Sequence, residues 1–320
     1  MLGRVSATSL LTIAILTAGA TEAHAQHYPI RPIRLIVSGV GGSADFVARM
    51  IAQGISPALE QPVVVENRAS SITSETVAKS PPDGYTLLLA SPSHWLLPLM
   101  RAHVNYDPAK DFTPITVATM SPNVLVVYPA LPVRSVKELI ALGKAQPSGL
   151  NYATTGTGTS NHMAAELFRV MTGIEMVRVN YKATSGALND LMSGQLQVSF
   201  HTVTSVAPYM SSGRLRALGV TSAERSMAFP ELPTVAATGL PGYESVSTLC
   251  IFAPAGLPVS VVNRLNQEIV RFLNLADTKA RLLKTGAEVV ASSPEQLMGT
   301  MKRDMSRMGK VIKDAGMRDE

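Results

Sequence analysis

The sequence predicts an α/β protein, in which strands alternate with helices along the chain. Its segments of strand length are mostly continuous apolar runs, and segments with helical spacing of apolar residues follow several of them. Continuous apolar runs are typical of parallel strands that helices cover on both faces. Alternation of such strands with helices predicts α/β sheets.

Eight segments are predicted to be strands from their apolar character and the turn residues around them. The third of them follows a Pro-Pro-Asp-Gly turn at 81–84. The predicted strands are 33–39, 62–67, 85–91, 123–129, 151–155, 177–181, 197–201 and 215–221.

Helices are predicted where apolar residues recur three and four positions apart. Segments 43–55 and 74–80 follow the first two strands. Two later helices have clear apolar faces, made of Ala164, Leu167, Phe168 and Met171, and of Val262, Leu265, Ile269 and Phe272. Ser293 can cap a final helix that has Pro294 at its first position and Glu295 in its first turn.

The first 25 residues are predicted to be a secretory signal peptide. Arg4 precedes an apolar stretch over residues 10–20, and the small-x-small sequence Ala-His-Ala follows at 23–25. The apolar stretch is shorter than the ~20 residues that a membrane-spanning helix needs. We therefore expect export, cleavage after Ala25, and Gln26 as the first residue of the mature protein.

Length, charge and cysteine content narrow the class of protein. Just under three hundred residues follow the predicted signal peptide, which suggests two domains. The net charge is +5, but the basic residues are scattered and no aromatic ladder accompanies them, so nucleic-acid binding is not expected. Cys250 is the only cysteine, which excludes an internal disulfide, and it is expected to be a buried apolar residue.

Four loops at the ends of predicted strands are rich in Gly, Ser and Thr. They span 38–45, 68–73, 91–94 and 154–162. In open α/β sheets, ligands bind beyond the carboxyl ends of the strands. A helix that starts there offers unpaired N–H groups and the positive end of its dipole, and hydroxyl groups add further donors. The loops therefore predict a site for a carboxylate or a phosphate.

Nucleotide binding and helix capping are two other possible roles of these loops. The pattern Gly156-x-Gly158-x-x-Asn161 lacks the third glycine of the dinucleotide-binding motif, and no loop contains the Gly-Lys-Ser/Thr of a P-loop. Simple helix capping, for example by Thr159 or Ser160, is an alternative for any single loop. Because several such loops occur in one chain, a shared ligand cleft is favoured.

Candidate ligand-binding residues lie in these loops or at the ends of neighbouring strands. They are Ser38, Gly39, Gly42, Ser43, Asp45, Ser70, Ser71, Ser91, Ser93, Thr155, Gly156, Thr157, Thr159, Ser160, His162, Thr184, His201 and Thr202. Asp45 has a second interpretation, since a negative charge in the first turn stabilises any helix. Metal-ligand spacings and a Gly-x-Ser-x-Gly motif are absent from the sequence, so no metal, cofactor or catalytic residue is expected.

Many stretches of the chain resemble the Bug family, the periplasmic solute receptors of tripartite tricarboxylate transporters. The matching stretches are 28–37, 41–52, 61–68, 78–90, 106–116, 131–147, 150–168, 179–191, 213–226 and 231–245. The resemblance implies a two-lobed α/β protein with the type II periplasmic-binding-protein fold and a ligand cleft between the lobes. It also implies a small ligand, usually a carboxylate, held largely by backbone amides, hydroxyls and waters.

The resemblance also implies a domain division, a location and partners. Lobe 1 would comprise residues 26–126 plus 249–320, and lobe 2 residues 127–248, with crossing segments near Val124–Tyr128 and Leu249–Ala253. A periplasmic monomer that delivers its ligand to the membrane subunits of a permease is expected. Signalling to a membrane sensor, or an enzyme that reuses the fold, are the alternatives.

The sequence departs from the family pattern around the expected cleft. The loop at 38–42 is shorter than usual, and a short Ala-Ser-Ser-Ile loop follows Arg68. His201 replaces a common Asp, Thr248 a common Trp, and Ala183 a common Gly. The fold assignment survives these differences, but the ligand of a relative cannot be transferred.

His201 follows an apolar run and is expected at the carboxyl end of a strand, facing the cleft. A neutral His there could donate one hydrogen bond, and a protonated one would add a positive charge. Anion binding would then tighten as the pH falls from about 8 toward 6. The alternative is a His bonded to backbone at the edge of a lobe, without ligand contact.

Overall fold

The computed structural model describes residues 28–40, 42–147 and 149–317. The predicted signal peptide lies outside these residues. Within them, no helix combines the length and apolar character that crossing a bilayer requires.

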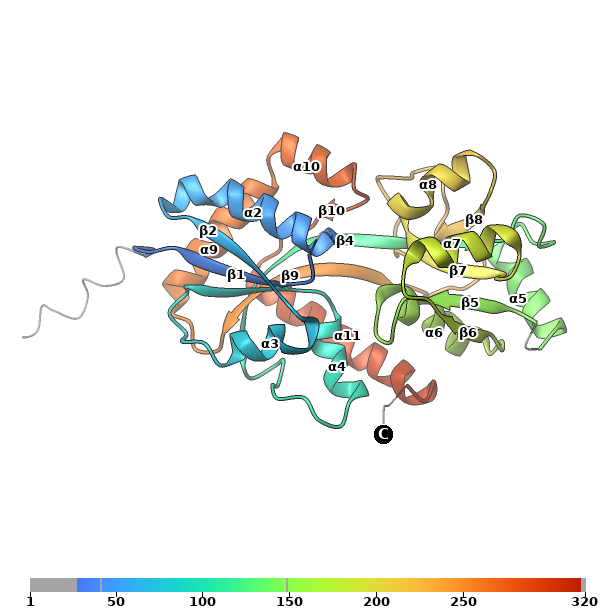
Figure 1. The fold of residues 1–320 in the computed structure, drawn as a ribbon, viewed down its shortest axis with the longest axis horizontal. Helices are drawn as coiled ribbons and strands as arrows, with labels where there is room; N and C mark the ends of the chain where they lie inside the picture. The colour runs from blue at the N-terminus through green and yellow to red at the C-terminus, as the bar shows by residue number, and fades with distance from the viewer. Residues whose placement is uncertain (1–27, 41, 148, 318–320) are drawn as a thin grey trace, which may run out of the picture.

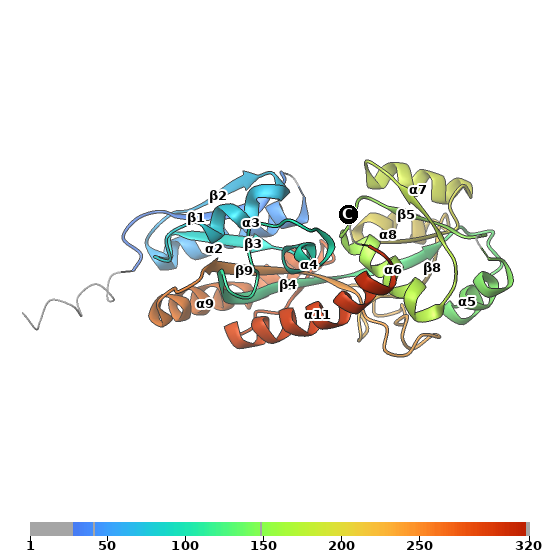
Figure 2. The same ribbon diagram turned by 90° about the horizontal axis from the view of Figure 1, so that it is seen from below.

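Helices and strands alternate as the sequence predicted, and Figures 1 and 2 show them in two groups. The strands are β1 (Ile33–Ser38), β2 (Val63–Arg68), β3 (Thr86–Ala90), β4 (Phe112–Val127), β5 (Asn151–Thr154), β6 (Val177–Asn180), β7 (Val198–Thr202), β8 (Arg216–Val220), β9 (Val246–Pro254) and β10 (Glu288–Val289). The helices are α2 (Ser43–Leu59), α3 (Ser70–Ala78), α4 (Ser93–Met100), α5 (Val136–Ala145), α6 (Ser160–Thr172), α7 (Thr184–Ser193), α8 (Val203–Ser211), α9 (Val259–Leu273), α10 (Ala276–Leu283) and α11 (Pro294–Asp314). All predicted strands are confirmed, but the first part of β4 and the whole of β9 were not predicted as strands.

The strands follow the order β2-β1-β3-β9-β4-β7-β5-β6, and β8 and β10 also pair with β4. The pairs formed among β1, β2 and β3, and among β5, β6 and β7, are parallel, as their continuous apolar runs suggest. Strand β9 is antiparallel to β3 and β4, and β4 is antiparallel to β7 and β8. The parallel strands therefore form two sets, β1–β3 and β5–β7. The antiparallel strand β4 joins them, because it pairs with β9, which lies beside β3, and with β7.

The change from one set to the other occurs within β4. Residues up to Pro122 pair with β9, and residues from Asn123 onward pair with β7 and β8. The chain returns where Ser245 donates to the Thr221 carbonyl at 2.8 Å and Val246 pairs with Pro122. Both crossings lie a few residues before the segments that the resemblance suggested. We propose these two points as the boundaries between the lobes.

The C-terminal helices pack in different ways. Helix α9 lies against α2 and β4, and Phe272 fits over Gly54, where a Cβ atom would come within 2.1 Å of its ring. Helix α11 contacts β4 and α4 but also α6. It therefore runs beneath both groups of elements, the one that contains β1–β3 and the one that contains β5–β7 (Figure 2). One buried cluster accordingly joins Phe252, Tyr152 and Met308.

The predicted helix faces are largely confirmed. Ala164, Leu167 and Phe168 are buried in α6, but Met171, in its last turn, is 37% exposed. At the start of α11, Ser293 Oγ accepts from the Gln296 N–H at 3.2 Å, and the Gln296 side chain accepts from the Ser293 N–H. Ser293 is therefore the N-cap, as expected, and this helix has a complete capping box.

Candidate ligand-binding cleft

A cavity of about 730 Å³ lies where the two groups of elements meet. Strands β1 and β3 end at it with Ser38 and Ala90, and the loop after β5 reaches it from the other side with Thr157. The start of β9 and the middle of α11 complete its wall. A space between the carboxyl ends of strands from two halves is the expected position of a ligand in this kind of α/β fold.

The structure brings part of the predicted site together. The predicted residues that line the cavity are Ser38, Ser43, Ser91, Ser93, Thr157, Thr159 and Ser160. The predicted residues that do not line it are Gly39, Gly42, Asp45, Thr155, Gly156, His162, Thr184, His201 and Thr202. Ser70 and Ser71 begin α3, but their side chains lie outside the described part of the structure.

Three helices begin at the cavity: α2 at Ser43, α4 at Ser93 and α6 at Ser160. The N-cap residues of these helices are Gly42, Pro92 and Thr159. Among the described residues, none of these three makes a side-chain hydrogen bond that caps its helix. The positive ends of the three helix dipoles therefore lie at the cavity. The N–H groups of His94 and His162 already donate to the Ser91 carbonyl and to Asn161 Oδ1, so a ligand would be bound by the other N–H groups of the first turns. The arrangement favours an anion over a neutral or cationic ligand.

Charged residues from distant segments also line the cavity, and no local sequence pattern predicted them. They are Arg101 after α4, and Asp304 and Arg307 on α11. Asp304 accepts from Trp95 Nε1 at 2.7 Å and lies 3.6 Å from Arg307, while burial raises the pKa of its carboxyl group. Arg307 also pairs with Glu244 at 3.3 Å.

His94 is a further cavity residue that sequence reasoning did not select. Its side chain is 3% exposed, and its Nδ1 atom lies 2.9 Å from Ser74 Oγ, which also lines the cavity. The ring stacks on Tyr106 with centroids 5.2 Å apart. Burial lowers the pKa of His94 to about 3, so this residue is neutral and cannot supply a positive charge to an anion at physiological pH.

Asp45 holds the loop after β1 instead of lining the cavity. It accepts from Asn67 Nδ2 at 2.9 Å and pairs with Arg49 Nε at 3.0 Å. Asn67 also donates to the Gly39 carbonyl, which connects the loop to β2. These contacts agree with the second interpretation of Asp45, as a residue that stabilises the start of α2.

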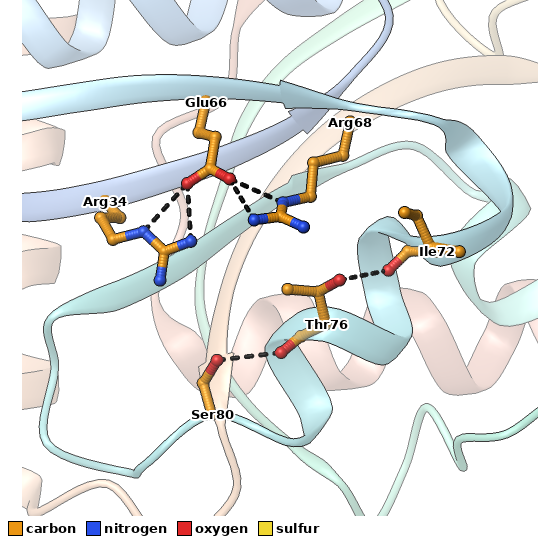
Figure 3. A network of polar contacts seen from close by, with 6 residues as sticks. All are labelled: Arg34, Glu66, Arg68, Ile72, Thr76 and Ser80. Atoms are coloured by element: carbon orange, nitrogen blue, oxygen red, sulfur yellow. Dashed lines mark hydrogen bonds and ion pairs between the residues drawn. The ribbon is translucent and has the colours of Figure 1, made fainter.

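Arg68 ends β2 beside the expected cleft, but its charge is compensated locally. Glu66 accepts from Arg68 Nε at 2.7 Å and from Arg34 Nε at 2.9 Å (Figure 3). The hydrogen bond from Arg34, followed by that from Arg68, lowers the pKa of Glu66. In the following helix, Thr76 Oγ1 donates to the Ile72 carbonyl (Figure 3).

His201 lies away from the cavity, inside the second group of strands. It is 3% exposed in β7, and its Nε2 atom lies 2.9 Å from Ser199 Oγ. Burial lowers its pKa to about 4. His201 therefore stays neutral between pH 8 and 6 in this conformation, and its protonation cannot tighten anion binding over that range. As in the alternative expectation, His201 does not line the cavity, but its hydrogen-bond partner is the Ser199 hydroxyl group and not the backbone.

The remaining predicted residues begin helices or shape loops. Thr184 is the first residue of α7, and Thr202 Oγ1 lies 2.8 Å from Ser205 Oγ in the first turn of α8. Among the described residues, no three His, Cys, Asp or Glu side chains are grouped as a metal site would require.

The fold and the cleft define a periplasmic-binding-protein type of solute receptor, built on a mixed α/β framework. A family model described as the tripartite tricarboxylate transporter family receptor matches residues 47–317. The chain belongs to this family, which the Bug resemblance had indicated. Its members are binding proteins, not enzymes.

Similar proteins and solved structures support this family assignment. The chain is 35% identical over 316 residues to protein BugT of Bordetella pertussis, covering 96% of this chain and 97% of that one. It is similar to the structure of R. palustris Rpa4515 with adipate, at 36% identity and a TM-score of 0.77, covering 90% and 98% of the two chains. It is also similar to MatC from Rhodopseudomonas palustris with bound malate, at 28% identity and a TM-score of 0.73, covering 89% and 100%.

Proposed function

We propose that this protein captures a small organic dicarboxylate in the periplasm and delivers it to a tripartite tricarboxylate-type permease. The observation that carries the proposal is the meeting of three helix starts at one cavity, without side-chain caps. Adipate and malate in two relatives support a ligand with two carboxylates.

Each group of elements would bind part of the ligand. One carboxylate would lie among the N–H and hydroxyl groups at Ser43, Ser93 and Ser160. Apolar side chains in the cavity wall, among them Leu97 and Met163, suit a short carbon chain. Arg101 would favour the second carboxylate electrostatically, whereas the charge of Arg307 is already shared with Glu244 and Asp304.

A periplasmic location is part of the proposal. The sequence begins with the pattern of a cleavable signal peptide, with the expected cut after Ala25. Similar solved structures include a periplasmic transporter and the periplasmic binding protein BugD. Sequencing the N-terminus of the exported protein would test the cleavage point.

We expect dicarboxylates to raise the melting temperature of the purified protein. A ligand present at a hundred times its Kd stabilises the native state by about 2.7 kcal/mol. Adipate and malate should be tested first, with the corresponding diamides as uncharged controls, and native mass spectrometry should identify any acid that copurifies. Stabilisation by diamides as strong as that by acids would contradict an anion site.

We expect ligand binding to bring the two halves of the molecule together about the crossings at Pro122 and Ser245. Small-angle scattering should then give a smaller radius of gyration with a saturating dicarboxylate than without it. A radius that does not change, when calorimetry shows binding under the same conditions, would contradict closure.

A further inference from the structure

A second cavity, of about 440 Å³, lies on the second half of the molecule, beside the end of α11. Its lining includes His162 and Glu166 from α6, and Arg178 from β6. Two of these residues, His162 and Arg178, make hydrogen bonds to Thr157 and Gly158, which line the first cavity. The loop after β5 is therefore contacted from behind by side chains that do not line the proposed ligand site.

Arg178 holds the loop through its side-chain nitrogens. Its Nη2 donates to Thr157 Oγ1 at 2.9 Å, and its Nε donates to Asn180 Oδ1 at 3.0 Å. Asn180 Oδ1 also accepts from Thr154 Oγ1 at 2.7 Å. The fork geometry of a guanidinium lets one side chain contact Thr157 directly and Thr154 through Asn180, which a lysine could not do.

His162 holds the next residue of the loop. The Gly158 N–H donates to His162 Nδ1 at 3.1 Å. Only a histidine without a proton on Nδ1 can accept this bond. Burial, followed by the charge of Arg178, lowers the pKa of His162 to about 4, while Glu166 opposes and Arg169 adds to the effect. The ring is therefore neutral throughout the physiological pH range, and the tautomer protonated on Nε2 can accept this bond.

Gly158 needs such support because its backbone conformation is unusual. Its φ is +76°, in the left-handed region, and a Cβ atom there would lie 2.9 Å from the Met100 methyl group. A glycine adopts this conformation without steric strain but has no side chain to anchor it. The anchoring comes from the neighbouring side chains of His162 and Arg178.

We propose that His162 and Arg178 are positioning residues for ligand binding. They hold Thr157 and Gly158 in the conformation that presents this loop to the bound anion, without touching the anion. The effect on affinity rests on the proposed function, whereas the effect on the loop does not.

The first test measures amide hydrogen exchange of the ligand-free mature protein. His162→Leu removes the acceptor and should speed exchange at Gly158 by about three- to tenfold, the range that loss of one hydrogen bond implies. In His162→Asn, the side-chain oxygen lies near the position of Nδ1, so exchange should return close to the wild-type rate. His103→Leu, at an exposed histidine elsewhere, is the matched control. Equal exchange at Gly158 in wild type and His162→Leu would overturn the proposal.

The pH profile separates positioning from a general loss of stability. In the wild type, protection of the Gly158 amide should fall as His162 takes up a proton near pH 4. Protection in the His162→Asn protein should show no such step. Protection that falls equally at Gly158 in both proteins would count against a role for His162.

The second test measures affinity for adipate and malate by calorimetry. His162→Leu should weaken binding by about three- to tenfold, and His162→Asn should recover most of it. Arg178→Lys keeps the positive charge but loses the forked geometry of the guanidinium. Weaker binding by this variant would support the positioning role of Arg178, and unchanged binding would overturn it. If neither acid binds the wild type, the proposed ligand class fails, and hydrogen exchange alone decides the positioning role.

Discussion

Lowering the pH from about 6.5 to 4 is expected to destabilise the protein steeply, because three buried histidines bind protons only when the chain unfolds. His94, His162 and His201 are each at most 3% exposed, and their pKa values are lowered to about 3, 4 and 4. An unfolded histidine has a pKa near 6.5, so between that pH and the folded pKa only the unfolded state is protonated. The free energy of unfolding should therefore fall as the pH falls through this window.

The expected slope is large. Each proton that only the unfolded state binds changes the free energy of unfolding by about 1.4 kcal/mol per pH unit, so three give about 4 kcal/mol per unit. Carboxylates with lowered pKa values, such as Glu66, reduce stability mainly below about pH 4.5. Urea denaturation at a series of pH values from 4.5 to 6.5 measures the histidine contribution.

A matched pair of substitutions assigns the effect. His201→Gln keeps a polar partner for Ser199 but cannot titrate, so it should reduce the slope by about one third. His103→Gln changes an exposed histidine and should leave the slope unchanged. An undiminished slope in His201→Gln would mean that His201 does not remain neutral in the folded protein.

Trp95→Ala is expected to reduce the free energy of unfolding by about 3–5 kcal/mol, the usual cost of truncating a large buried aromatic residue. Trp95 is fully buried against Phe252, and its Nε1 donates to Asp304. The substitution leaves a cavity and also removes a hydrogen bond from a mostly buried carboxyl group, so the upper end of the range is expected.

Trp95→Phe is the control, because it keeps an aromatic ring but removes the bond to Asp304. It should cost about 1–3 kcal/mol. Circular dichroism should follow unfolding, since Trp95 is the only tryptophan and its fluorescence is lost in both variants. If Trp95→Phe and Trp95→Ala reduce the free energy of unfolding equally, the hydrogen bond to Asp304 contributes more to stability than the packing of the ring.

The elements that sequence reasoning found are those with a strong local pattern. The apolar runs of β1, β3 and β7 and the capping residues of α11 can be recognised without tertiary information. The first part of β4 was missed because Pro114 and Pro122 interrupt it, and prolines argue against a central strand. The structure accommodates this strand with irregular pairing to β9 between Pro114 and Thr116 and between Val117 and Thr119.

The candidate site was predictable only where its residues lie close together in the sequence. Loop composition identified Ser43, Ser93 and Thr157, since glycine and hydroxyl residues mark helix starts. Arg101 and Arg307 are brought to the cavity by packing between distant helices, which leaves no local signal. The sequence position of His201 suggested a strand end at the cleft, but it could not reveal that β4 pairs along β7 and that Ser199 satisfies the ring.

The shared strand β4 has a consequence for how this architecture could be divided or recombined. Its first part completes the sheet containing β9, and its last part completes the sheet containing β7 (Figure 1). A gene cut at Pro122 would leave each fragment with a strand edge that lacks its partner. Neither half could then be exchanged between proteins as an independent module, so variation in ligand choice is expected to arise through substitutions in the loops, within an undivided scaffold.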